Sequence, residues 1–447
     1  MKHSLYPPGP KAKTPLGHLL AIRRDLIGML TTIAKEYGDI AYFKIGPIDI
    51  VLLNHPDYIK DVLVTHHRNF VKGRPLEMAK RLLGEGLLTS EGEFHTRQWR
   101  MIQPAFHRKR IEAYGAVMAD YASRLSERWC DGMAVDIAQK MTQMATAIAG
   151  KTMFNTDVES AAPEIDRALA AATSLFTRVS IPFSEWLLKL PLPSTFRFYR
   201  AKARLDATIY RMINEHRRSG KDDGALLSLL LLAQDEEGDQ GVMTDQQVRD
   251  EALTLLLTAF DTTSLALTWT WYLLSQHPEA EAELHAELDR VLGGRLPTVD
   301  DLPKLQYTRM VLTEAMRLYP PLYVIARKAL NDYPVDQYIV PAGTLILMSP
   351  YLIHRDRRFY ANPSKFDPKQ WASETHPQAP KFAYFPFGGG PRSCIGESFA
   401  WMEGILVIAT LAQRWQMRLV PGHPVALLPL VNLRPKYGMS MIVQRRE

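Results

Sequence analysis

Cysteine is nearly absent from this chain of 447 residues, which contains only Cys130 and Cys394. Two cysteines cannot build the disulfide framework on which small secreted domains depend. Such sparse use is typical of a reducing compartment, so we expect a cytoplasmic protein. The chain is also long enough to bury a large hydrophobic core without covalent cross-links.

Uninterrupted hydrophobic runs are scarce as well. Residues 1–11 contain neither a segment of membrane-spanning length nor the apolar stretch of a signal peptide. The most apolar window, 253–274, is long enough to cross a bilayer, but it contains Asp261 and six threonines. Because an ionisable group in the middle of a bilayer is costly, we interpret this window as a buried core helix. We therefore expect a soluble protein with no integral membrane segment.

Neither sign of charge dominates. With 54 Lys and Arg against 48 Asp and Glu, the net charge is +6. This excess is too diffuse to indicate nucleic-acid binding, and we expect none. The hydrophobic and charged fractions, 46% and 23%, are those of an ordinary globular protein.

The hydrophobic patterns predict a mainly α protein with minor β-structure (α+β), in a single domain over residues 1–447. Residues 37–75 alternate apolar and polar side chains around glycines and prolines, which is typical of short strands. Thr244 and Gln247 have the spacing of a capping box that opens the long apolar helix. The 3.6-residue period that indicates helices is found at about 93–290, 305–319 and 397–415, and a strand-rich tail follows.

The most distinctive segment is 385–400, a glycine-rich loop that contains Cys394 and leads into an apolar helix. Glycine adopts positive φ without steric cost, so the loop can turn tightly. The turn places Cys394 at a helix N-terminus, where free N–H groups and the helix dipole favour a thiolate. A thiolate suits a soft metal. The alternative is a small apolar core residue, which is the commoner role of a buried cysteine.

The spacing around Cys394, Phe387-x-x-Gly390-x-Arg392-x-Cys394-x-Gly396, favours the metal ligand. It resembles the haem-binding loop of the cytochrome P450 superfamily at every fixed position. The resemblance implies that Cys394 is the fifth ligand of the iron in haem b, that Phe387 shields the sulfur, and that Arg392 binds a propionate. Gly390 and Gly396 would let the backbone approach the porphyrin. The implied structure is the cytochrome P450 fold, a large helical domain with small β-sheets that encloses the haem.

A second motif, Glu314-Ala-Met-Arg317, places an acid and an arginine on one helix face. Taken alone, it is compatible with an ordinary surface ion pair. Its position before the Cys394 loop resembles the structural pair of cytochromes P450, which braces the core beneath that loop. Where the family has a third partner, an arginine, this chain has Gln370, which can hydrogen-bond but brings no charge.

The segment 258–263, Thr-Ala-Phe-Asp-Thr-Thr, lies within the apolar window. Threonines in mid-helix often only bond back to the i−4 carbonyl. The segment nevertheless resembles the oxygen-binding stretch of cytochromes P450. The resemblance implies that Thr262 assists dioxygen over the distal face of the haem, while Asp261 relays protons from solvent. Ala259 stands where glycine is usual, so we expect a tighter groove in the helix.

The segment 92–106 resembles the one from which cytochromes P450 contact the propionates. On this match His95 takes the first position, and Trp99 stands in the second in place of an arginine. Either the indole N–H of Trp99 or the neighbouring Arg100 would then replace that arginine. Arg327 matches a further propionate-binding arginine; its alternative is an ordinary surface residue.

Two other motifs have simpler interpretations. The sequence His354-Arg-Asp356 matches the start of a kinase catalytic loop, but no glycine-rich phosphate loop or Asp-Phe-Gly motif accompanies it, so we reject that function. The basic run 107–110 is most often a solvated helix end. In the P450 arrangement it would lie on the proximal side, where an acidic electron-transfer protein docks.

Family analogy predicts an apolar substrate pocket formed by segments 76–88, 176–186 and 322–326, the distal helix and the tail. Its individual candidates are Leu82, Phe176, Ala259, Phe260, Val324, Ile325 and Val431. The matched positions that face the iron carry no arginine or lysine. We therefore expect a lipophilic substrate such as a terpene, a fatty acid or a steroid.

The four motifs together imply a bacterial-type haem-thiolate monooxygenase that inserts one oxygen atom from O2 into a C–H bond. No flavin- or iron–sulfur-binding segment is recognisable, so separate proteins must supply electrons. We expect an acidic ferredoxin or flavodoxin with an NAD(P)H-dependent reductase, and a monomeric enzyme.

Three alternatives remain. A peroxide-driven peroxygenase would need another acid–base group in place of Asp261 and Thr262. A non-catalytic haem-thiolate sensor or carrier would not need that pair. A haem-free helical binding protein would require the Cys394 loop to be a coincidence.

Overall fold

The apolar window forms α11 (Asp245–Gln276), the central helix of the protein. The structure is a computed structural model that describes residues 6–155, 193–219, 224–235, 241–372 and 379–446. The predicted capping box opens α11: Gln247 N donates to Thr244 Oγ1 (3.3 Å), and Thr244 N donates to Gln247 Oε1 (2.8 Å). Within the described residues α11 alone is long and apolar enough to cross a membrane, and 72% of that window is buried inside the protein. It is a core helix, as predicted.

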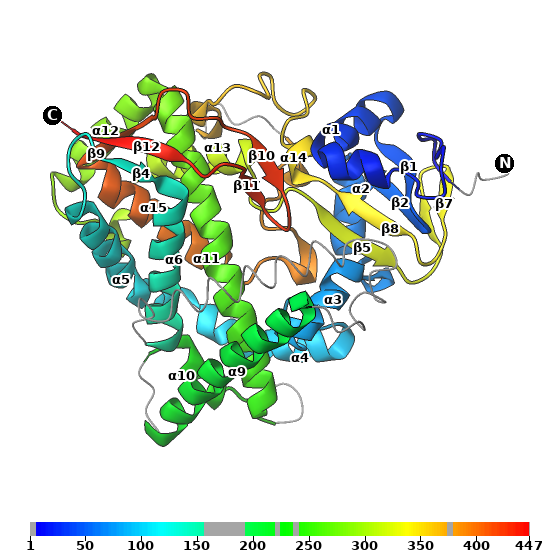
Figure 1. The fold of residues 1–447 in the computed structure, drawn as a ribbon, viewed down its shortest axis with the longest axis horizontal. Helices are drawn as coiled ribbons and strands as arrows, with labels where there is room; N and C mark the ends of the chain where they lie inside the picture. The colour runs from blue at the N-terminus through cyan, green and yellow to red at the C-terminus, as the bar shows by residue number, and fades with distance from the viewer. Residues whose placement is uncertain (1–5, 156–192, 220–223, 236–240, 373–378, 447) are drawn as a thin grey trace.

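Helices surround α11 on one side of the molecule, and the largest sheet lies on the other (Figure 1). The predicted helices at 305–319 and 397–415 are α13 and α15, each within a few residues of the expected ends. The described helices besides α11 are α1 (Leu19–Tyr37), α2 (Pro56–Lys60), α3 (Arg74–Leu83), α4 (Gly92–Ile102), α5 (Arg108–Glu127), α6 (Ile137–Phe154), α9 (Pro193–Ser219), α10 (Leu226–Leu232), α12 (Pro278–Leu292), α13 (Gln306–Leu318), α14 (Pro350–Ile353) and α15 (Glu397–Ala412).

The strands form small sheets, as expected for residues 37–75 and for the tail. The largest sheet has the order β1-β2-β8-β5-β3, with β2 and β8 parallel and the other neighbours antiparallel. The others are β4-β12-β9, β10-β11 and β6-β7. The strands are β1 (Ile40–Ile45), β2 (Ile48–Leu53), β3 (Phe70–Lys72), β4 (Ala134–Asp136), β5 (Ile325–Ala329), β6 (Tyr333–Val335), β7 (Tyr338–Val340), β8 (Leu345–Met348), β9 (Trp415–Leu419), β10 (Leu427–Pro429), β11 (Leu433–Pro435) and β12 (Ser440–Arg445).

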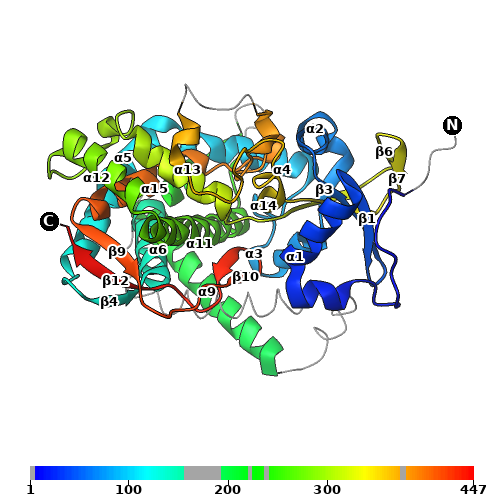
Figure 2. The same ribbon diagram turned by 90° about the horizontal axis from the view of Figure 1, so that it is seen from above.

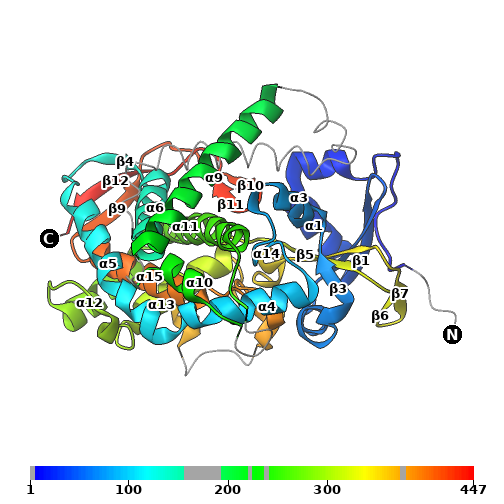
Figure 3. The ribbon, with the colours of Figure 1, turned by 90° about the horizontal axis from the view of Figure 1, so that it is seen from below.

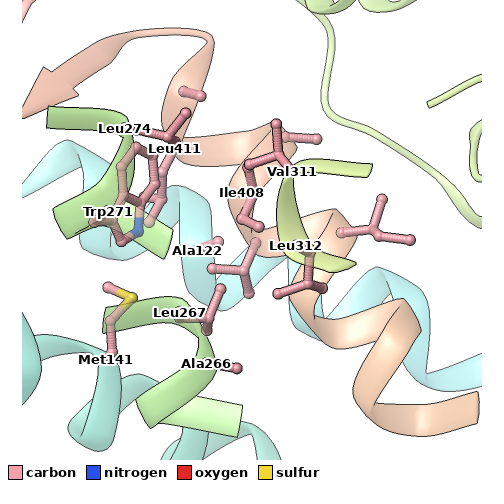
Figure 4. Packing of buried hydrophobic residues seen from close by; sticks show 14 of the residues in the cluster. Ala122, Met141, Ala266, Leu267, Trp271, Leu274, Val311, Leu312, Ile408 and Leu411 are labelled. Carbon is pink, nitrogen blue, oxygen red and sulfur yellow. The ribbon is translucent and has the colours of Figure 1, made fainter. Parts of the chain in front are cut away.

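The main hydrophobic core lies where α5, α6, α11, α13 and α15 meet. Trp271 and Leu274 of α11 pack there beside Leu411 of α15, and Ile408 lies near Val311 (Figure 4). The views from above and below show α11 running through the molecule, with α6 alongside it (Figures 2 and 3). Since large apolar side chains fix α11 and α15 against each other, the loop before α15 is held in place relative to α11.

Candidate active site

A cavity of about 680 Å³ lies next to the middle of α11. The Cys394 loop lines it, together with parts of α3, α4, segment 321–327 and the tip of the β10–β11 hairpin. Most of the wall is apolar, and its charged side chains form the two groups described below. The cavity therefore brings together segments that are far apart in the sequence.

The loop that carries Cys394 is a series of tight turns. Gly388 has φ 72° and donates its N–H to Phe385 O (3.0 Å), and Cys394 N donates to Phe387 O (3.0 Å). Gly390 has φ 71°, and a Cβ there would lie 2.0 Å from Leu63 O. Glycine is required at Gly390 because the loop packs on the segment before β3, so its role differs from the expected approach to a porphyrin.

The sulfur of Cys394 borders the cavity. Phe387 and Gly396 line the same cavity. Desolvation by the surrounding protein raises the pKa of the Cys394 thiol to about 11, although the residue is exposed at the cavity and the Gly396 N–H opposes the shift. We expected the helix N-terminus to favour a thiolate, but desolvation outweighs it until a cation is bound. A metal ion at the sulfur would reverse that balance.

Four basic side chains line another part of the cavity: Lys72, His95, Arg327 and Arg392. Burial, followed by repulsion from Arg392, lowers the pKa of Arg327 to about 10. Burial and the same neighbour lower the pKa of Lys72 to about 7. Burial, Lys72 and Arg392 lower the pKa of His95 to about 3. Glu91 offsets part of this charge, since it pairs with Arg392, and Glu251 lies close enough to Lys72 to act on it as well.

This surplus of positive charge fits the two propionates of a haem. Carboxylates from a ligand would pair with guanidinium and ammonium groups that otherwise repel one another. In addition, His95 Nε2 is buried and has no hydrogen-bond partner among the described residues. The residues present thus fit a haem, with Cys394 as the ligand of its iron and the basic wall around its propionates. When bound, the haem supplies the activation of dioxygen and the transfer of oxygen.

Trp99 and Arg100 lie in different places relative to the cavity. Trp99 lines the cavity. Arg100 is not among the described residues that line it, and its guanidinium donates from Nε and Nη2 to Asp235, both at 3.1 Å. We therefore withdraw Arg100 as a candidate for cofactor contact and retain Trp99.

Asp261 and Thr262 of α11 both line the cavity. Thr262 Oγ1 donates to Thr258 O (3.0 Å), which is the bond back to the preceding turn that mid-helix threonines commonly make. The Asp261 carboxylate accepts hydrogen bonds from Asn432 and Arg434. The pair thus faces the cavity, but its acid is held by residues of the C-terminal tail.

The predicted substrate pocket is largely on the cavity wall. The wall includes Leu82, Ala259, Val324, Ile325 and Val431. Phe260 is an error of the sequence interpretation: it is 1% exposed, is not among the described residues that line the cavity, and packs in a separate core cluster. Phe176, with the rest of segment 176–186, lies outside the described residues.

Glu314 and Arg317 form a buried ion pair in α13, with Nε–Oε2 and Nη2–Oε1 distances of 2.7 and 2.8 Å. Gln370 Nε2 donates to Glu314 Oε1 (2.6 Å), and Trp371 Nε1 donates to Glu314 Oε2 (2.9 Å). The carboxylate therefore obtains from an amide and an indole the hydrogen bonds that the expected arginine would have made.

The wall also contains Lys72, Asn432 and Arg434, which were not predicted from the sequence. Asn432 and Arg434 meet Asp261 across sequence separations of 171 and 173 residues. No local sequence pattern predicts such a contact. The predicted pocket residue Val431, which directly precedes Asn432, did indicate this part of the tail.

Comparisons with known proteins agree with this geometry. The family model "Cytochrome P450" matches residues 7–438. Cyclooctatin synthase and cyclooctat-9-en-7-ol 5-monooxygenase of Streptomyces melanosporofaciens are each 38% identical; the first alignment covers 97% of this chain and 94% of the relative, and the second covers 91% and 88%. Pentalenene oxygenase of Streptomyces avermitilis is 33% identical over 95% of each chain.

Solved structures show the same fold. The heme domain of cytochrome P450DA has a TM-score of 0.90 at 26% identity and covers 99% of this chain and 98% of its own. A cyanobacterial cytochrome P450 with bound retinoic acid has a TM-score of 0.88 at 24% identity, with 99% of both chains covered. The match over nearly the whole chain, the fold and the monooxygenase relatives lead to one conclusion: this chain belongs to the cytochrome P450 family and is a haem-dependent monooxygenase.

Proposed function

We propose that this monooxygenase hydroxylates a cyclic terpene or terpene alcohol, with haem b as its cofactor. The observation that carries the proposal is the aliphatic wall beside Cys394, which α3 and the stretch 322–326 provide. Such a wall binds a hydrocarbon by removing its surface from water, at about 25 cal/mol per Å². Among lipophilic classes, the names of the three bacterial relatives favour terpenes over fatty acids and steroids.

Each group of wall residues has a role in this proposal. Cys394 holds the iron, with Phe387 and Gly396 packed around the sulfur. Asp261 and Thr262 deliver protons, and the aliphatic wall excludes water and orients the C–H bond to be oxidised. The propionate contacts are assigned to Lys72, His95, Trp99, Arg327 and Arg392.

Electrons in this proposal come from an acidic ferredoxin or flavodoxin and its NAD(P)H-dependent reductase. Phe106 lies near Gly396, since a Cβ on that glycine would be 4.0 Å from the Phe106 ring. Lys109 follows at the start of α5 and is exposed. An exposed cation at this position supports docking of an acidic partner on the cysteine side. We further propose a monomeric, cytoplasmic, single-domain enzyme.

Substrate binding to the purified holoprotein tests the terpene proposal. Pentalenene, cyclooctat-9-en-7-ol, palmitic acid and progesterone are titrated while the Soret band is followed. Each is then incubated with NADPH, a plant-type ferredoxin, its reductase and ¹⁸O₂. We expect a Soret shift and a product with one ¹⁸O atom from a terpene. Turnover of only the fatty acid or only the steroid would refute the proposed substrate class while leaving the monooxygenase assignment intact.

A further inference from the structure

The cavity wall contains a second polar group, which is distinct from the basic residues around the proposed propionate site. It consists of Asp261 on α11 and of Asn432 and Arg434 at the tip and second strand of the β10–β11 hairpin. These three polar side chains stand in a wall that is otherwise mostly apolar. Their contacts show what they do.

Both oxygens of the Asp261 carboxylate are engaged. Arg434 Nη2 donates to Oδ1, and Asn432 Nδ2 donates to Oδ2. Two donors on separate oxygens fix the rotation of a carboxylate as well as its position. The Asp261 side chain is 13% exposed and that of Arg434 is 35% exposed, so the ion pair leads from a buried acid to a more accessible cation.

The hairpin tip is itself anchored to the elements around the cavity. Trp269 Nε1, on α11, donates to Leu433 O (3.0 Å), and Leu433 N donates to Pro321 O (2.9 Å). Tyr323 Oη donates to Leu430 O (2.8 Å). Because these bonds hold the backbone on both sides of Asn432, the donors reach Asp261 from a fixed support.

We infer that Asn432 and Arg434 are positioning residues for proton delivery by Asp261. The carboxylate accepts one proton from the solvent side, passes it toward the Thr262 hydroxyl, and is regenerated as the anion that Arg434 binds. Arg434 and Asn432 return the carboxylate to the same orientation after each transfer. Neither residue takes the proton itself.

The same hairpin touches the space for substrate. Leu430 and Val431 line the cavity immediately before Asn432. A substrate that packs against Leu430 and Val431 therefore contacts the same hairpin that orients the Asp261 carboxylate. The inference rests on the proton delivery proposed for Asp261 and Thr262, and it holds whether or not the substrate is a terpene.

The test measures the fraction of the consumed dioxygen that is released as hydrogen peroxide. This fraction should rise when protons reach the reduced oxygen too slowly for the oxygen to be transferred to substrate. The holoprotein is supplied with NADPH and a plant-type ferredoxin and reductase, with and without whichever of pentalenene, cyclooctat-9-en-7-ol, palmitic acid and progesterone gives the largest Soret shift. We expect Arg434→Gln to raise the peroxide fraction severalfold and to lower turnover about tenfold, since small misplacements of a reacting group are costly. Arg434→Lys should recover part of the loss. Lys436→Gln, an exposed change in the same tail, is the matched control and should leave both values unchanged.

A double-mutant cycle assigns the effect to Asp261. If Arg434 acts through the carboxylate, Arg434→Gln adds nothing to the peroxide fraction in an Asp261→Asn background. Crystal structures provide a readout independent of activity: the Asp261 side chain should leave its orientation in Arg434→Gln and keep it in Lys436→Gln.

Two results would overturn the inference. One is an equal effect of Arg434→Gln with and without Asp261. The other is an unchanged peroxide fraction at normal thermal stability, which would make Arg434 a purely structural residue. A weaker Soret titration with unchanged peroxide would instead make it a substrate contact, and would count equally against positioning.

Discussion

Two arginines close together in the sequence, Arg317 and Arg327, lie in opposite electrostatic surroundings. Arg317 is fully buried and forms two hydrogen bonds with the Glu314 carboxylate. Its remaining N–H groups donate to the carbonyls of His354, Pro363 and Lys365. Arg327 instead borders the cavity, where burial and the neighbouring Arg392 lower the pKa of its guanidinium.

The contrast separates a structural cation from a ligand-binding one. A buried ion pair with every donor satisfied holds its surroundings together and needs nothing further. A group of cations with a charge surplus is unfavourable until an anion arrives. Removing Arg317 should therefore damage the fold, whereas removing Arg327 should damage cofactor binding.

Arg317→Ala should be the most damaging change, because it leaves the Glu314 carboxylate charged and buried without its cation. We expect a loss of about 3–5 kcal/mol in the free energy of unfolding, or failure to fold. Urea unfolding followed by circular dichroism measures it. Arg327→Ala is the matched control; a similar loss there would contradict the contrast.

Arg327→Gln should weaken haem retention with little effect on folding. Loss of a charge-assisted hydrogen bond, worth about 1.5–3 kcal/mol, corresponds to a roughly 10- to 100-fold faster transfer of haem to apomyoglobin, if the loss falls on dissociation. The haem-free variant should be as stable as the parent or slightly more stable, because repulsion with Arg392 is removed. Unchanged haem transfer would exclude Arg327 from the cofactor site.

Gln370→Ala should cost about 1.5 kcal/mol of stability, since it removes one hydrogen bond to the charged Glu314. The loss should be smaller than that in Arg317→Ala because Trp371 and Asp367 N still donate to the same carboxylate. Thermal unfolding of both variants gives the order. A loss in Gln370→Ala as large as in Arg317→Ala would mean that the amide is more than an auxiliary donor.

The contacts formed within one short segment of the chain could be predicted from the sequence. The Glu314–Arg317 pair and the Cys394 loop were predicted because each depends on residues within one short segment, where helix spacing and turn geometry determine which side chains meet. The capping box of α11 was predicted for the same reason.

Long-range contacts could not be predicted in that way. The periodicity of α11 does not show which side of the helix the cavity occupies, so Phe260 was placed on the wrong face. Arg434 contacts Asp261 because the β10–β11 hairpin folds back over α11. Arg100 binds Asp235, which lies 135 residues further along the chain. Sequence spacing carries no information on such pairings.

The smallest predicted effect concerns pH and the structural region. Burial, with repulsion from Arg317 and Arg355, keeps the pKa of His354 well below 6.5, and its Nε2 accepts a hydrogen bond from Phe385 N (3.0 Å). The unfolded chain binds a proton at His354 as the pH falls through about 6.5, whereas the folded protein does not. The stability contribution is therefore complete above pH 6.5 and decreases below it, with a limiting slope of about 1.4 kcal/mol per pH unit.

His354→Gln should make this pH dependence shallower, because an amide oxygen can still accept from Phe385 N but does not titrate in this range. Urea unfolding at pH 7.5 and pH 5.5 gives the difference, which we expect to be about 1 kcal/mol smaller in the variant. Exposed His107 supplies the control, His107→Gln, in which the difference should match the parent protein. An unchanged difference in His354→Gln would show that the loss of stability in acid arises elsewhere, for example at His95 and His285, whose pKa values burial also lowers.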